Sequence, residues 1–169
     1  MPLIDLHSSR FSQRIKKNDI RYYIRNTNRN AETISKKLQS IAKEQGFIVT
    51  LNEMNYHNID SFKQLKNVAI ITSTYGNGEV PEMGKDFWEE LKSSKVEMAN
   101  LRYGLIALGD KSHEIFCGAG KAISKKLDEL KCEKVIKNLE CDGDTEGTHE
   151  WSIKFLEKLK LKAYYNDKV

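Results

Sequence analysis

The sequence predicts a single domain of the α/β class, in which helices cover both faces of a parallel sheet. Short apolar or β-branched runs alternate along the chain with segments whose apolar residues recur at helical spacing, and this alternation is typical of a parallel sheet. The 169 residues, 39% of them hydrophobic, suffice for one core of this kind and are too few to suggest a second domain.

The first two predicted strands flank an amphipathic helix. Residues 20–25 form the first strand-like run. Apolar side chains then recur on one helical face at Ala31, Ile34, Leu38, Ile41 and Ala42. We expect the helix to end at Gly46, because glycine commonly follows the last helical residue. The second strand is predicted at residues 47–51.

The rest of the chain repeats this pattern. A polar stretch that can hold a short helix precedes the third strand. The remaining strands are predicted at residues 68–72, 101–108 and 134–139, and the helices that follow them are marked by apolar residues within 84–91, 119–130 and 151–159. The prediction is therefore five strands, each followed by a helical segment.

Residues 1–19 precede the first strand and are predicted to be an extension of a domain that covers residues 20–169. An organelle transit peptide is the alternative interpretation of this segment. The net charge is +4, and the excess of Lys and Arg lies in the first 46 residues. Because the remainder lacks a basic stripe with interleaved aromatic residues, we expect no nucleic-acid partner.

Cysteine and histidine usage argues against several classes of site. The three cysteines form no C-x-x-C pair and are odd in number, which favours a reducing compartment, and we expect the cytoplasm. The four histidines are scattered without metal-ligand spacing, so no metal site is predicted. No apolar stretch approaches the roughly 20 residues of a membrane span, so no membrane association is expected.

The predicted binding site lies on three loops that follow the first, third and fourth strands, because ligands of such sheets bind at the carboxyl ends of the strands. The first loop, residues 26–31, leads hydroxyl and amide side chains into a helix N-terminus, which favours an anion. Plain helix capping is the alternative interpretation. In the second loop, Gly76 and Gly78 permit close approach to a flat ligand, and Tyr75 offers a stacking face. An ordinary glycine-rich turn is the alternative.

The third loop adds Gly109, His113 and Phe116. In order and spacing, the three loops resemble the FMN-binding loops of the short-chain flavodoxin-like family, especially the FMN domains of sulfite reductase flavoproteins and diflavin reductases, and the MioC-type flavodoxins. The resemblance is strongest at residues 72–81 and 107–117 and extends over about residues 20–161. It implies a three-layer flavodoxin-like fold with a five-stranded parallel sheet in the order 2-1-3-4-5.

The resemblance also implies a set of FMN-binding residues. Residues 26–31 would surround the phosphate, Tyr75 would stack on the isoalloxazine ring, and His113 takes the position where relatives usually place a second stacking tyrosine. The full set implied in this way is Asn26, Thr27, Asn28, Arg29, Asn30, Ala31, Ser73, Thr74, Tyr75, Gly76, Asn77, Gly78, Leu108, Gly109, Asp110, His113, Phe116, Cys117 and Asp142.

The phosphate loop departs from the family pattern at two positions. Asn28 stands where a second threonine is usual, and Arg29 stands where a glycine is usual. The guanidinium of Arg29 could pair directly with the phosphate. The alternative is a binding or regulatory module that has lost or weakened FMN binding because Arg29 occupies the phosphate position.

The predicted function is electron transfer through noncovalent FMN, with no catalytic residue of the protein's own. We expect a monomer whose partners are an NAD(P)H-dependent reductase and an electron-acceptor protein. A small quinone reductase is a third possibility, although nothing in the sequence marks a nicotinamide site. The mouth of the site should be acidic and attract basic partners, owing to Glu79, Glu82, Asp110, Glu114, Asp142, Asp144 and Glu146.

Overall fold

The computed structural model describes residues 19–24, 29–56 and 58–166. Its strands are β1 (Asp19–Ile24), β2 (Ile48–Glu53), β3 (Asn67–Ser73), β4 (Arg102–Gly109), β5 (Glu133–Lys134) and β6 (Leu139–Asp142). Its α-helices are α2 (Arg29–Glu44), α3 (Ile59–Phe62), α4 (Lys85–Ser93), α5 (Gly118–Glu129) and α6 (Thr148–Asn166). Two short 3₁₀ helices, η1 (Met54–Tyr56) and η2 (Glu82–Gly84), complete the described elements.

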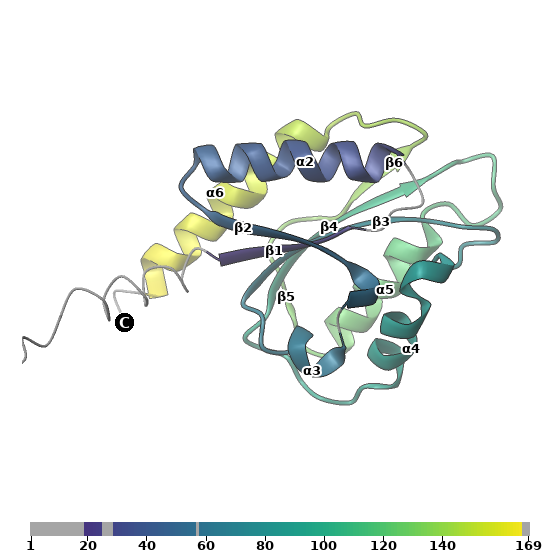
Figure 1. Cartoon of the computed structure of the whole chain (residues 1–169), viewed down its shortest axis with the longest axis horizontal. Helices are drawn as coiled ribbons and strands as arrows, with labels where there is room; N and C mark the ends of the chain where they lie inside the picture. Colours follow the sequence, from purple (N-terminus) through teal and green to yellow (C-terminus); the bar gives the residue numbers. More distant parts are fainter. Residues whose placement is uncertain (1–18, 25–28, 57, 167–169) are drawn as a thin grey trace, which may run out of the picture.

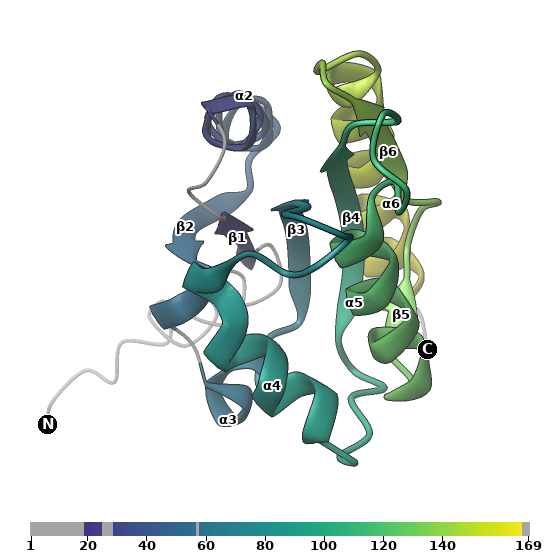
Figure 2. The same ribbon diagram turned by 90° about the vertical axis from the view of Figure 1, so that its right-hand side faces the viewer.

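The strands form one parallel sheet in the order β2-β1-β3-β4-β5, and β6 also pairs with β4. The predicted order 2-1-3-4-5 is therefore confirmed, and Figure 2 shows β2, β1, β3 and β4 side by side in this order. Helices α2 and α6 cover one face of the sheet, while α4 and α5 cover the other (Figure 1). Three layers result, as the fold class predicts.

Apolar packing between these layers explains why the predicted periodicities hold. Leu38 of α2 and Phe155 of α6 are fully buried against the sheet, and Phe87 of α4 and Ile123 of α5 are buried on its opposite face. Every residue of β3 is buried, because both faces of this central strand are covered. Burial of this kind stabilises each large side chain by about 1.5–3 kcal/mol.

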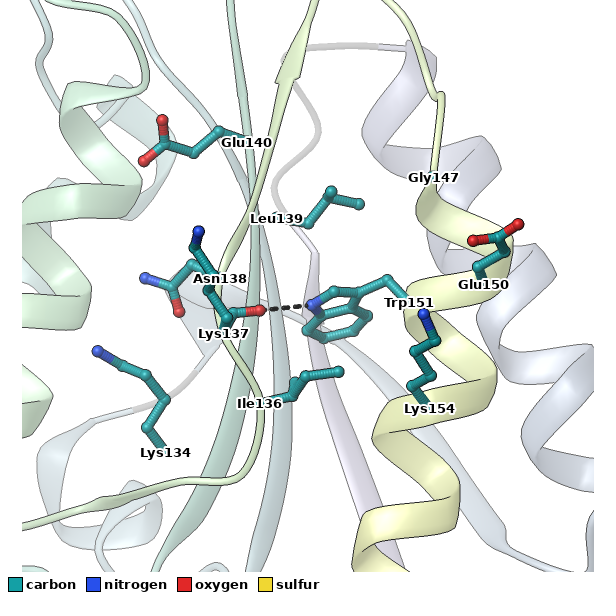
Figure 3. Close-up of a pocket in the computed structure, with 10 residues that line it drawn as sticks. All are labelled: Lys134, Ile136, Lys137, Asn138, Leu139, Glu140, Gly147, Glu150, Trp151 and Lys154. Carbon is teal, nitrogen blue, oxygen red and sulfur yellow. Dashed lines mark hydrogen bonds between the residues drawn. The ribbon is translucent and has the colours of Figure 1, made fainter.

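The fifth strand differs from its prediction. Residues 134–139 were expected to form one strand, but β5 and β6 are separate short strands that pair with different parts of β4. Between them, Trp151 Nε1 donates a hydrogen bond of 2.9 Å to the Lys137 carbonyl (Figure 3). Asn138 Nδ2 donates to Ser124 Oγ at 2.8 Å. At residues 137 and 138 the chain therefore makes tertiary hydrogen bonds at the point where strand pairing with β4 is interrupted, although these residues look strand-like in the sequence.

Candidate functional site

A cavity of about 210 Å³ lies where the chain leaves the carboxyl ends of β3 and β4. The residues that line it are Ser73, Thr74, Gly76, Leu108, Gly109, Asp110, His113, Ile115 and Gly143. Seven of these nine belong to the set implied by the sequence, and they come from two loops far apart in the chain. The predicted convergence of the second and third loops is therefore present in the structure.

The second loop is a tight reversal over residues 75–79. Tyr75 N–H donates to the Glu79 carbonyl at 3.0 Å, and Glu79 N–H donates back to the Tyr75 carbonyl at 2.9 Å. Gly76 has a φ of +50° and Gly78 a φ of +95°, backbone angles that residues other than glycine rarely adopt. The Tyr75 side chain remains 68% exposed, so its ring is available to a ligand.

The third loop is held by hydrogen bonds around Asp110. Ser112 N–H donates to Asp110 Oδ1 at 2.7 Å, and His113 N–H donates to the Asp110 carbonyl at 3.1 Å. Hydrogen bonds from the side chain and then the backbone of Ser112 hold the pKa of the Asp110 carboxyl below its usual value. His113 is exposed and lines the cavity. The loop thus presents a carboxylate and an imidazole at the cavity.

The turn after β6 connects this site to the start of α2. Gly143 N–H donates to the Gly109 carbonyl at 2.8 Å, and Asn30 Nδ2 donates to the Gly143 carbonyl at 3.4 Å. Arg29 is exposed as the first residue of α2, and Ala31 is buried beneath it. The start of α2 therefore lies beside the cavity. Asn26, Thr27 and Asn28 fall outside the described residues.

The side-chain hydroxyl of Thr74 indicates a ligand in the cavity. Its Oγ1 atom is buried and has no hydrogen-bond partner in the described part of the chain, although its backbone N–H donates to the Leu108 carbonyl at 3.0 Å. Buried hydroxyls almost always have a partner. Because Thr74 lines the cavity, a polar ligand there would supply the missing hydrogen bond.

Several residues of the expected set do not line the cavity. Cys117 is fully buried, and its thiol donates weakly to the carbonyls of Ala107 at 3.4 Å and Cys141 at 3.9 Å. Its backbone is in the left-handed region, with a φ of +54°. Phe116 lies close to Gly109, because a Cβ on Gly109 would meet Phe116 Cδ2 at 3.2 Å. Both residues therefore lie beside the third loop without lining the cavity.

Tyr75, Asn77 and Asp142 also lie outside the lining, but each directly follows or precedes a residue that belongs to it. Gly78 lies outside it as well, although a Cβ on Gly78 would meet the lining residue Ile115 at 2.7 Å. Conversely, Ile115 and Gly143 line the cavity and were not in the expected set. Gly143 follows the carboxyl end of β6, the same kind of position as the predicted loops. A sequence prediction that ended the last strand at Asp142 would have indicated Gly143 as a further site residue.

The rim of the cavity is acidic. All seven carboxylates expected at the mouth are exposed. Glu82 has Lys85 at 3.9 Å and Asp142 has Lys111 at 3.5 Å as ion-pair partners. The other five form no ion pair with a described residue: Glu79, Asp110, Glu114, Asp144 and Glu146. These five carboxylates give the loops around the cavity a local excess of negative charge.

A larger hollow of about 760 Å³ lies at the sheet edge, along residues 134–140 and α6. Figure 3 shows that its polar side chains diverge: Lys134 and Asn138 point away from the helix, whereas Glu150 and Lys154 project from α6 itself. They do not converge on a common point. The smaller cavity at the loops is therefore the better candidate for a ligand-binding site.

Two further classes of site find no support in the described residues. No group of three or more His, Cys, Asp or Glu side chains there is placed to hold a metal ion. Within the same part of the chain, the helices lack the combination of length and apolar character that crossing a membrane requires.

Comparison with known proteins points to one family. Residues 27–154 match the family model described as Flavodoxin. The sulfite reductase [NADPH] flavoprotein alpha-component of Shewanella sp. (strain MR-7) is 34% identical over 133 residues, covering 78% of this chain and 22% of the relative. The protein of the same description from Bacillus subtilis (strain 168) is 32% identical over 124 residues, covering 72% and 20%. The chain thus spans about a fifth of the length of these relatives.

Solved structures show the same fold. Oxidised Flavodoxin 2 from Bacillus cereus matches with a TM-score of 0.73 at 22% identity, covering 83% of this chain and 99% of that chain. The Streptococcus pneumonia TIGR4 flavodoxin matches with a TM-score of 0.67 at 24% identity, covering 85% and 97%. At these identities the likeness establishes the fold alone.

Proposed function

Since this chain belongs to the flavodoxin family, we propose that it binds one FMN noncovalently at the loop cavity and carries electrons between a reductase and an acceptor protein. The observation that carries the proposal is the cavity itself. It lies at the carboxyl ends of β3 and β4, is lined by Thr74, whose hydroxyl has no partner among the described residues, and is next in sequence to the exposed side chain of Tyr75.

Three loops of the chain would each bind a different part of FMN. Residues 26–31 would hold the phosphate, with the N-terminus of α2 adding a favourable dipole. Tyr75 would stack on the isoalloxazine ring, and Thr74 and Gly76 would offer polar groups at its edge. FMN supplies the redox chemistry when bound, and the protein sets its potential through stacking, hydrogen bonds and charge.

The acidic rim supports a partner with a basic docking surface. Five carboxylates without an ion pair among the described residues lie on or next to the loops that form the cavity, and a local excess of negative charge accelerates association with a positively charged protein at low salt. We propose an NAD(P)H-dependent reductase as electron donor and a second protein as acceptor. The relatives are sulfite reductase [NADPH] flavoproteins by name, which favours NADPH as the nucleotide of the donor. The three free, buried cysteines favour a reducing compartment, and we propose the cytoplasm.

A binding module without FMN is the second candidate, and Arg29 is the residue on which the two candidates differ. Arg29 places a positive charge at the first turn of α2, where the helix dipole opposes it. Such a charge is disfavoured unless an anion compensates it. The carrier function explains Arg29 through the FMN phosphate, whereas the module explains it as a residue that fills the phosphate position.

Electron transfer tests the proposal. Protein loaded with FMN is mixed anaerobically with NADPH and a catalytic amount of an NADPH-dependent flavodoxin reductase, and flavin absorbance is followed. A carrier is reduced only when the reductase is present, then becomes reoxidised when a haem-protein acceptor is added. Rapid reduction by NADPH alone would instead indicate a quinone-reductase type of enzyme. Failure to be reduced in either mixture would count against a carrier.

A further inference from the structure

The ring of Phe116 is approached by two lysine ammonium groups. Lys111 Nζ lies 5.5 Å and Lys121 Nζ 5.4 Å from the ring centroid, within the roughly 6 Å at which a cation is attracted to an aromatic face. The ring is partly buried and also packs against the apolar core beneath α4 and α5. We call Lys111, Phe116 and Lys121 the lysine clamp.

Both lysines of the clamp also contact β6. Lys111 Nζ lies 3.5 Å from Asp142 Oδ2, and Lys121 Nζ lies 3.5 Å from Glu140 Oε2. Glu140 and Asp142 are two residues apart on one strand, so their side chains leave the same face of the sheet. The backbone N–H of Lys111 also donates to Asp142 Oδ1 at 2.8 Å. The clamp therefore joins the third loop, the first turn of α5 and the edge strand.

The clamp holds both ends of the segment that reaches the cavity. Lys111 fixes the start of the segment, and Phe116 fixes its end. Between them lie His113 and Ile115, which line the cavity. The Phe116 ring also lies close to Gly109, another lining residue, because a Cβ there would meet Phe116 Cδ2 at 3.2 Å. A movement of the ring would therefore move the cavity wall.

We propose that Phe116 is a positioning residue of the flavin site: through the lysine clamp, it fixes where the segment between Lys111 and Phe116 presents its side chains to the cofactor. This inference rests on the proposed function and assigns Phe116 an indirect role in place of direct FMN contact. Since both ammonium groups are substantially exposed, their contribution is screened by salt.

Riboflavin titration isolates this effect. Because riboflavin lacks the phosphate, its dissociation constant should not depend on phosphate contacts made by residues 26–31. Phe116→Leu removes the ring and keeps an apolar side chain, while Phe116→Tyr restores the ring. If the loss of both cation–π contacts at this exposed site is transmitted fully to the ligand, Phe116→Leu should lose riboflavin affinity by roughly five- to thirtyfold. Phe116→Tyr should bind riboflavin as the wild type does.

A double-mutant cycle shows whether the ring and the lysines act together. Lys111→Met and Lys121→Met should each weaken riboflavin binding in the wild-type background. In the Phe116→Leu background, the fold-change in the riboflavin dissociation constant caused by each lysine substitution should be less than half as large. The matched control is Lys125→Met, which alters another exposed lysine of α5 and should change nothing. The loss caused by each clamp lysine should also shrink at about 0.5 M salt.

The outcomes separate this inference from the function on which it rests. If the wild type binds neither FMN nor riboflavin, both are overturned. If the wild type binds both, and Phe116→Leu binds riboflavin equally well, the positioning role alone is overturned. Lysine effects that stay undiminished in the Phe116→Leu background contradict it as well. Should Phe116→Leu fail to fold, as judged by its circular dichroism, the Lys111→Met/Lys121→Met double variant, which keeps the ring, carries the test.

Discussion

A Cβ atom on Gly78 would lie 2.7 Å from Cγ2 of Ile115. This relationship joins the second and third loops, which are separated by more than thirty residues in the sequence and both contribute residues to the candidate site. Gly118 completes the junction, because a Cβ there would approach the Gly78 carbonyl oxygen to 2.6 Å. The two loops can pack this closely only where the backbone lacks side chains.

Gly78→Ala should therefore separate the loops and weaken FMN binding. Its φ of +95° disfavours alanine by about 1 kcal/mol or more, and the contact with Ile115 adds a clash. Gly46→Ala is the matched control, since Gly46 has a φ of +84° but nothing within 4 Å of its Cβ position. We expect both variants to unfold at lower urea concentration and only Gly78→Ala to lose FMN affinity. Equal FMN affinities would show that the loop junction does not shape the site.

Tyr75→Ala should weaken FMN binding by about 1–3 kcal/mol, as loss of stacking on a flat ring does in comparable sites. Because the side chain is 68% exposed, the free energy of unfolding of the unliganded protein should change little. Fluorescence titration of FMN and urea unfolding measure the two quantities. An unchanged dissociation constant would remove Tyr75 from the site.

Arg29→Ala distinguishes the two candidate functions by the sign of its effect. If Arg29 pairs with the FMN phosphate, its removal should weaken FMN binding by about 1–3 kcal/mol, the range for hydrogen bonds to charged groups. Riboflavin binding should then be little affected. If Arg29 blocks the phosphate position, the variant should bind FMN more tightly than the wild type. Parallel titrations of both ligands into both proteins decide between them.

The buried thiols predict a loss of stability in alkali. Burial raises the pKa of Cys117 and Cys141 to about 11 and that of Cys132 to about 12, against about 8.5 in an unfolded chain. Above pH 8.5 the unfolded state therefore binds fewer protons than the native state, so the free energy of unfolding falls as pH rises toward the folded pKa values. The limiting slope is about 1.4 kcal/mol per pH unit for each thiol.

Urea unfolding between about pH 7.5 and 9.5 measures this slope. Other groups titrate in the same range, so the informative comparison is with Cys132→Ala, which should show a shallower slope than the wild type. The same native thiols should react slowly with a colorimetric thiol reagent until urea is added. Fast reaction of all three in the native protein would contradict their burial.

Much of this fold could be predicted from the sequence, because its helices and central strands are strongly periodic. The face from Ala31 to Ala42 became α2, and the apolar run at 68–72 became the fully buried β3. The loops after β3 and β4 were placed correctly because the carboxyl ends of parallel strands meet at one edge of the sheet. These features depend on local pattern and on topology alone.

The remainder depends on tertiary contacts that leave little trace in the sequence. Val135, Ile136 and Leu139 look like one strand, yet the Trp151 indole meets the Lys137 carbonyl where the ladder breaks. Phe116 was expected in the FMN-binding set because it is a planar side chain of the third loop and the family resemblance includes it. Its two lysine neighbours come from different elements, and no spacing rule predicts that they meet at its ring.

The most direct test of the central claim is a titration of FMN into the purified protein, followed by the quenching of flavin fluorescence and by the absorbance of the protein after desalting. The carrier account predicts saturation at one FMN per chain and a yellow protein that keeps its flavin, with weaker quenching by riboflavin. A protein that stays colourless after desalting and leaves FMN fluorescence unchanged would contradict the account and favour a module without FMN.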